Sequence, residues 1–151
     1  MPPRFCQQSD VERAVGGAAQ LVQLLDKDAD NVADLDLVNQ AIDAACNELA
    51  SYIEPTVAAA SLSAPFPLIL VLKSADAAAF YAWRFGAYGQ AIPDNVLQAH
   101  EKAISWAKDV GAKTATLVVS PKATLNQPVG VVDHDSDGTK LSVAGLKRGF
   151  R

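Results

Sequence analysis

The stretch LDLVNQAIDAACNELASYI, residues 35–53, decides the fold class of this chain. Its apolar side chains recur at three- and four-residue steps, which places them on one side of an α-helix. They are Leu35, Val38, Ile42, Ala45, Cys46, Leu49 and Ile53. Asp34 is suited to cap the start of such a helix, and Pro55 is suited to end it. The stretch therefore predicts a long amphipathic helix with one face in a core.

Two short helical segments are expected before this helix. Ser9 followed by Glu12 has the spacing of a capping box, so the first segment should begin near Asp10. Two adjacent glycines at residues 16–17 should interrupt it. The second segment should span residues 18–25 and end at an acidic turn. Its core-facing residues are Leu21, Leu24 and Leu25.

Two long helices are expected after residue 53. Pro67 and Pro93 suit their first turns. The backbone N–H groups in the first turn of a helix have no partner within the helix, so proline, which has no N–H, loses no hydrogen bond there. The first helix should cover residues 68–85, and the second should end at Gly111. Residues 68–85 are apolar on most sides, so this helix is expected at the centre of the core or buried against a neighbouring subunit. Together these patterns predict a mainly α fold, a small bundle of about four to five helices over residues 1–112.

The last part of the chain, residues 113–151, differs in charge and periodicity. Residues 1–112 carry 7 basic and 14 acidic side chains, whereas residues 113–151 carry 6 basic and 3 acidic ones. Short β-prone runs and a turn at 135–138 replace the helical period. We expect a long extended C-terminal arm that can include one short β-hairpin and that docks on a partner. The alternative is a frayed terminus. The predicted partner-binding residues are Leu141, Val143, Leu146, Lys147, Arg148, Phe150 and Arg151.

Composition and cysteine usage exclude several function classes. A net charge of −4 argues against a general nucleic-acid binder, which needs clustered Lys and Arg. Cys6 and Cys46 are too few for a disulfide scaffold and lack zinc or redox spacing. The N-terminus lacks the apolar run of a signal peptide, and no apolar stretch is long enough to span a bilayer. We therefore expect synthesis in the cytoplasm and no membrane contact.

Catalytic motifs are missing from the sequence. It has no Gly-rich phosphate loop, no nucleophile elbow and no zinc-protease motif, and the glutamates, Glu48 among them, are scattered like ordinary surface charges of helices. His100 is expected in the core, and His134 on the surface. We therefore expect no enzyme and no cofactor. A small helical enzyme or ligand carrier that uses an aromatic pocket around Trp83 stays open as an alternative, although core or interface packing is the favoured explanation of these rings.

The loop after residue 25 is rich in carboxylates. Asp26, Asp28, Asp30 and Asp34 stand at positions 1, 3, 5 and 9 of a calcium loop of the EF-hand type. Position 6 is Asn31 instead of Gly, and position 12 is Leu37 instead of a bidentate Glu. The favoured interpretation is a turn whose carboxylates bond backbone amides and cap the following helix. A calcium-binding helical interaction module that uses these four aspartates is the alternative.

Several segments, taken in order, carry a family resemblance. They are LLDKDAD at 24–30, AIDAA at 41–45, ELASYI at 48–53, PFPLIL at 65–70, and the helical stretches 75–89 and 92–107. Their sequence and spacing resemble the head-to-tail connector proteins of Mu-like bacteriophages, also called adaptor or head-completion proteins. Residues 141–150 are similar to the short basic and aromatic segment that closes those proteins. At Asn31 and Ala33 the chain departs from the family, in which Gly and a polar residue are common, and this weakens the case for an inherited metal site.

The resemblance implies a structural virion protein without a catalytic role. About twelve copies would form a closed ring below the portal protein and extend the DNA channel. The ring would also provide the docking site for the next neck component, a stopper or tail terminator. Viral DNA would pass through the lumen during genome ejection without sequence-specific binding. The expected location is the head–tail junction of the virion.

Overall fold

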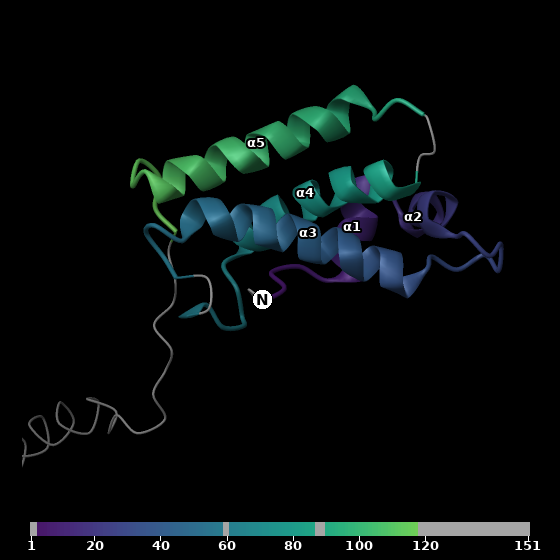
Figure 1. Cartoon of the computed structure of the whole chain (residues 1–151), viewed down its shortest axis with the longest axis horizontal. Helices are drawn as coiled ribbons and strands as arrows, with labels where there is room; N and C mark the ends of the chain where they lie inside the picture. Colours follow the sequence, from purple (N-terminus) through teal and green to yellow (C-terminus); the bar gives the residue numbers. More distant parts are fainter. Residues whose placement is uncertain (1–2, 59–60, 87–89, 118–151) are drawn as a thin grey trace, which may run out of the picture. The chain divides into compact units, whose positions relative to one another are not determined.

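The computed structural model describes residues 3–58, 61–86 and 90–117. Within these ranges it contains five helices, which Figure 1 shows: α1 (Gln8–Val15), α2 (Ala18–Leu25), α3 (Leu35–Ile53), α4 (Leu68–Gly86) and α5 (Asp94–Gly111). The predicted mainly α fold, a small helical bundle, is confirmed. The predicted β-hairpin lies outside the described residues.

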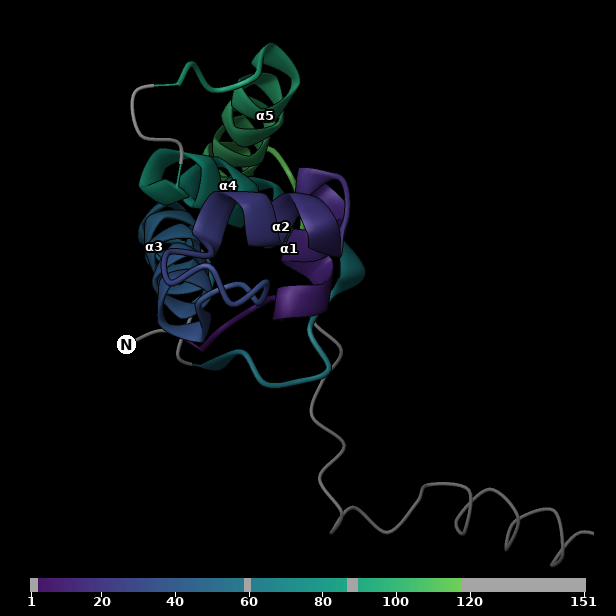
Figure 2. The same ribbon diagram turned by 90° about the vertical axis from the view of Figure 1, so that its right-hand side faces the viewer.

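Helix α4 lies at the centre of the bundle, with α5 on one side and α1, α2 and α3 on the other (Figures 1 and 2). Its buried face consists mainly of small side chains, which let neighbouring helices approach closely. They are Leu70, Ser74, Ala75, Ala77, Ala78, Ala79 and Ala82. A Cβ at Gly86 would clash with the Leu24 carbonyl oxygen, and a Cβ at Gly111 would clash with that of Tyr52. Residues 68–85 thus form a central core helix, one of the two arrangements that the sequence left open.

The start of α1 differs from the prediction. The helix begins at Gln8 and not near Asp10, with Gln7 as its capping residue. The Gln7 N–H donates to the Asp10 carboxylate at 2.9 Å, so this pair closes the capping box in place of Ser9 and Glu12. The two pairs have the same spacing, but the capping-box pattern prefers Ser or Thr at its first position and Glu or Gln at its fourth, so it favoured Ser9 with Glu12. The sequence therefore predicted the helix correctly but placed its first residue too late.

The residues before α1, a strap that we define as residues 3–7, are anchored on α3. The Arg4 guanidinium donates to both carboxylate oxygens of Asp43, at 2.6 and 2.8 Å, and to the Asn39 side-chain oxygen at 2.7 Å. This contact holds the pKa of the Asp43 carboxyl below its usual value. Next to Arg4, the Phe5 side chain is fully buried. The strap thus joins the bundle through one ion pair and two core residues, Phe5 and Cys6.

After α5 the chain remains in contact with the bundle. The Thr114 hydroxyl donates to the Asp109 carbonyl oxygen at 3.0 Å. Leu117 is buried in the core. All described residues belong to one compact unit, Met1–Ser120. The predicted division into a helical domain, 1–112, and a C-terminal arm, 113–151, stays a prediction, because residues 118–151 lie outside the described ranges.

Candidate functional site

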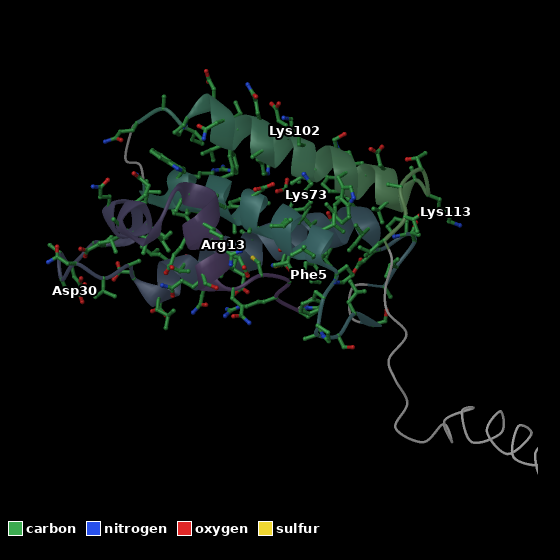
Figure 3. All side chains as sticks on the ribbon, turned by 180° about the vertical axis from the view of Figure 1, so that it is seen from behind. Phe5, Arg13, Asp30, Lys73, Lys102 and Lys113 are labelled. Atoms are coloured by element: carbon green, nitrogen blue, oxygen red, sulfur yellow. The ribbon has the colours of Figure 1, made fainter. Side chains whose placement is uncertain are left out.

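Three of the four predicted calcium ligands converge in the loop between α2 and α3. Carboxylate oxygens of Asp26, Asp28 and Asp30 lie within 4.8 Å of one another. Asp30 lies in the part of this loop that projects from the helices (Figure 3). Asp34 is not in this group, and its carboxylate accepts a hydrogen bond from the Lys27 N–H at 3.2 Å. Asp34 does occupy the residue before α3, as predicted, but its side chain makes no capping hydrogen bond there.

The loop also uses its carboxylates to bind its own backbone. Asp26 accepts hydrogen bonds from the N–H groups of Asp30 and Asn31, at 3.2 and 2.9 Å. Asp30 in turn accepts one from the N–H of Val32 at 2.8 Å. Asn31 has a left-handed backbone, with φ of 66°, which asparagine tolerates better than most residues. The predicted aspartate-rich turn, whose carboxylates bond backbone amides, is therefore present.

Charge is crowded in this loop. The negative charge of Asp30 raises the pKa of the fully exposed Asp28 carboxyl. Three carboxylate oxygens at this spacing suit a hard cation, which prefers oxygen ligands. Leu37, at the position of the bidentate ligand in a complete loop, offers no oxygen from its side chain. The loop can therefore supply three carboxylates to a cation, but not the full ligand set of an EF-hand.

Glu48 does not behave as the ordinary surface charge that the sequence pattern predicts. One of its carboxylate oxygens accepts a hydrogen bond from the Tyr81 hydroxyl at 3.1 Å and lies 3.0 Å from Nε2 of His100. The three residues belong to α3, α4 and α5, so one carboxylate joins the three long helices. Burial, together with the Glu48 carboxylate, raises the pKa of Tyr81. No sequence motif predicts this group, because its three members lie on different helices and come together only when the helices pack.

The aromatic residues of α4 pack within the bundle. The half-buried ring of His100 stacks on Phe80, with centroids 4.1 Å apart and planes 16° from parallel. Trp83 packs against the core, and its buried Nε1 has no hydrogen-bond partner among the described residues. The expected core histidine is thus partly confirmed, since one face of His100 is packed while its Nε2 reaches Glu48. For Trp83 and Phe85, the preference for packing over a ligand pocket agrees with their contacts to the core.

The start of α4 exposes large apolar side chains. Leu68, Ile69 and Leu72 are 71 %, 39 % and 45 % exposed, and we call these three residues the α4 patch. Beside it runs a groove that Leu72 lines together with Arg13 of α1 and Asp76 of α4. Neighbouring apolar side chains rimmed by charges are typical of protein contact surfaces. The α4 patch is therefore a candidate interaction surface.

Comparison with known families identifies the chain more closely. The family model described as Bacteriophage Mu, Gp36 matches residues 5–133. The chain belongs to this family. The Gp36 match includes all five helices and the acidic loop, and it makes the chain a Mu-like phage protein. Neither the curated proteins nor the solved structures gave a match.

The predicted docking tail lies beyond both the Gp36 match and the described residues. The match ends at residue 133, and the structure describes the chain up to Leu117. The predicted partner-binding residues Leu141, Val143, Leu146, Lys147, Arg148, Phe150 and Arg151 thus stay predictions. Among the described residues of this Gp36-family protein, none of the helices has the length and apolar character needed to cross a bilayer.

Proposed function

We propose that this protein is a structural virion protein, the head-to-tail adaptor of a Mu-like tailed phage. About twelve copies form a ring below the portal protein, extend the DNA channel and receive the next neck component. The observation that carries the proposal is the family match, which spans the whole helical bundle. The resemblance of the helix order and spacing to connector proteins supports the finer assignment to the head–tail junction.

The α4 patch supplies a contact between ring subunits. Each subunit of a closed ring presents one surface to the preceding copy and a different surface to the next copy. Leu68 and Leu72 are exposed on a helix whose opposite face is packed in the core. Packing these two side chains against a second copy would remove their apolar surface from water and so stabilise the contact. We therefore assign a second copy of this chain as the occupant of the patch.

The acidic body suits the wall of a DNA channel. Residues 1–112 carry twice as many acidic as basic side chains, 14 against 7. Exposed acids lie both in the α2–α3 loop, at Asp28 and Asp30, and on α5, at Glu101 and Asp109. A negative wall repels DNA phosphates, so the duplex slides through without sequence-specific binding.

The basic tail docks on the portal protein or on the next neck component. Residues 138–151 contain Lys140, Lys147, Arg148 and Arg151 and no acid, interleaved with apolar side chains. A segment that folds on its partner contributes binding free energy only once that partner is in place. Assembly of the head–tail junction then proceeds in a fixed order.

The mass of the purified protein, alone and with its portal protein, tests the adaptor function. Light scattering with negative-stain imaging should show a closed ring, free or formed on the portal. Replacing Leu72 by Asp should abolish the ring, because a charge then enters the subunit contact, whereas Leu97→Asp, at a 39 % exposed position of α5, should leave it intact. A chain that stays monomeric and does not bind the portal would contradict the proposal.

A calcium-binding interaction module is the second candidate function. The convergence of three carboxylates, at Asp26, Asp28 and Asp30, favours it. Millimolar calcium should then raise the melting temperature, and the double variant Asp26→Ala with Asp28→Ala should lose this rise. Asp36→Ala, an exposed acid in the first turn of α3, serves as the control and should keep the rise. If calcium leaves the melting temperature of the native chain unchanged, this candidate fails.

A further inference from the structure

The strap brings together two cysteines that are forty positions apart in the sequence. Cys6 and Cys46 are both free and almost completely buried, at 3 % and 1 % exposure. The N–H of Phe5, the residue before Cys6, donates to the sulfur of Cys46 at 3.3 Å. The residues of α3 that hold the strap, Asn39, Asp43 and Cys46, follow one another at steps of four and three and so share one face of that helix. The strap is thus fixed with the backbone next to Cys6 against the Cys46 sulfur, and both cysteines lie in the buried core.

The environment gives the two thiols different reactivity. A hydrogen bond between the two side chains lowers the pKa of Cys46 and raises the pKa of Cys6, and burial raises the latter further. The buried Ser74 hydroxyl of α4 also interacts with the Cys6 thiol. Because the thiolate is the nucleophile in disulfide chemistry, Cys46 is the side chain that reacts first.

We propose that Cys6 and Cys46 are a cross-linking site, which forms an intramolecular disulfide when the protein meets a small-molecule disulfide such as oxidised glutathione. The Cys46 thiolate attacks one sulfur of the oxidant, which breaks its S–S bond and releases one reduced thiol. The Cys6 sulfur, having lost its proton to water, then attacks the mixed disulfide at Cys46 and releases a second reduced thiol. The protein loses two hydrogen atoms, and the oxidant is reduced to two thiols.

Access of the oxidant requires the strap to lift from α3. The ion pair between Arg4 and Asp43 lies at the protein surface, with side chains 47 % and 30 % exposed, and it holds the strap next to the buried sulfurs. Segments held by solvent-exposed contacts open at lower free energy than the packed core. Breaking the ion pair should therefore speed disulfide formation without changing the cysteines. Once formed, the bond ties the strap covalently to α3 and limits this opening.

The experiment treats the purified full-length chain with oxidised glutathione, then unfolds it and blocks free thiols with N-ethylmaleimide. Mass spectrometry should show a monomer that has lost two hydrogen atoms and takes up no maleimide, and peptide mapping should join Cys6 to Cys46. The oxidised chain should melt several degrees higher than the reduced chain, because a disulfide restricts the unfolded state. Dithiothreitol should reverse both changes.

Matched variants separate the cross-link from general thiol oxidation. Cys6→Ser should keep a glutathione adduct on Cys46 and should show no rise in melting temperature. Arg4→Ala should form the disulfide several-fold faster than the native chain. If both cysteines of the native chain and of Arg4→Ala remain open to maleimide, or carry separate glutathione adducts, the proposal is overturned. Dimers linked through either cysteine would also overturn it. None of these readouts depends on the adaptor function.

Discussion

The Glu48 carboxylate contacts polar side chains from two other helices. A partly buried charge is costly unless hydrogen bonds replace the water that it loses. Tyr81 and His100 supply these contacts at 3.1 and 3.0 Å, and Phe80 holds the imidazole in place from one face. The position of α5 relative to α3 and α4 is therefore fixed by polar contacts as well as by apolar area.

Tyr81→Phe tests this contact at the scale of one hydroxyl. Removing a donor to a carboxylate should lower the free energy of unfolding by about 1 kcal/mol, since the site is only partly shielded from water. Tyr52→Phe is the control, because its ring lies under the Lys108 ammonium, a contact that phenylalanine keeps. Urea unfolding of both variants provides the measurement. Equal stability of the two variants would show that the Tyr81 hydroxyl contributes nothing.

The Arg4–Asp43 pair predicts a pH dependence. Because the folded chain depresses the pKa of Asp43, its contribution to stability is present above the unfolded pKa, about 3.9, and is lost as the pH falls through the folded pKa. Asp43→Asn should cost about 0.5 kcal/mol at pH 7, a small value because the pair is exposed to solvent. The difference from the native chain should close below pH 4. A difference that stays constant down to pH 2 would contradict this assignment.

Helices as elements were predictable from local sequence, whereas their contacts were not. The apolar period placed α3 at residues 35–53 and α2 at residues 18–25, which are their observed bounds. At α1, two capping pairs of equal spacing competed, and the pattern favoured the wrong one. The close approach of α4 to the end of α2 depends on Gly86, which the sequence marks only as a helix end.

Gly86→Ala tests the close approach of these two elements. The new Cβ would meet the backbone carbonyl of Leu24, which cannot rotate away as a side chain could. We expect a loss of about 1–3 kcal/mol in the free energy of unfolding, the usual cost of overpacking. Lys102→Ala, on the exposed face of α5, should change stability by less than about 0.5 kcal/mol (Figure 3). Similar values for the two variants would show that α2 moves away without cost.

At the scale of the whole molecule, the proposed adaptor function needs two contacts. The proposal gives the exposed α4 patch to a second copy and the tail at residues 138–151 to a different partner. They predict different defects when changed. Loss of the patch should prevent the ring, whereas loss of the tail should leave the ring and prevent its attachment.

Deletion of residues 138–151 tests the role of the tail in the particle. Heads made with the shortened chain should fill with DNA but should not join tails, because the docking segment is missing. Electron microscopy of lysates, with the full-length chain supplied from a plasmid as the control, measures the fraction of tailed particles. Normal numbers of DNA-filled tailed particles from the shortened chain would rule out the docking role.

The sequence by itself determined the helices and the acidic turn, because helical periodicity and aspartate-rich turns depend on residues a few positions apart. It also carried the family resemblance, because that rests on the order and spacing of short segments. Only the tertiary structure decided that Glu48 meets Tyr81 and His100, and that the strap meets Cys46 through the Phe5 N–H. These contacts join residues tens of positions apart, and no local pattern of the sequence specifies which distant segments pack together.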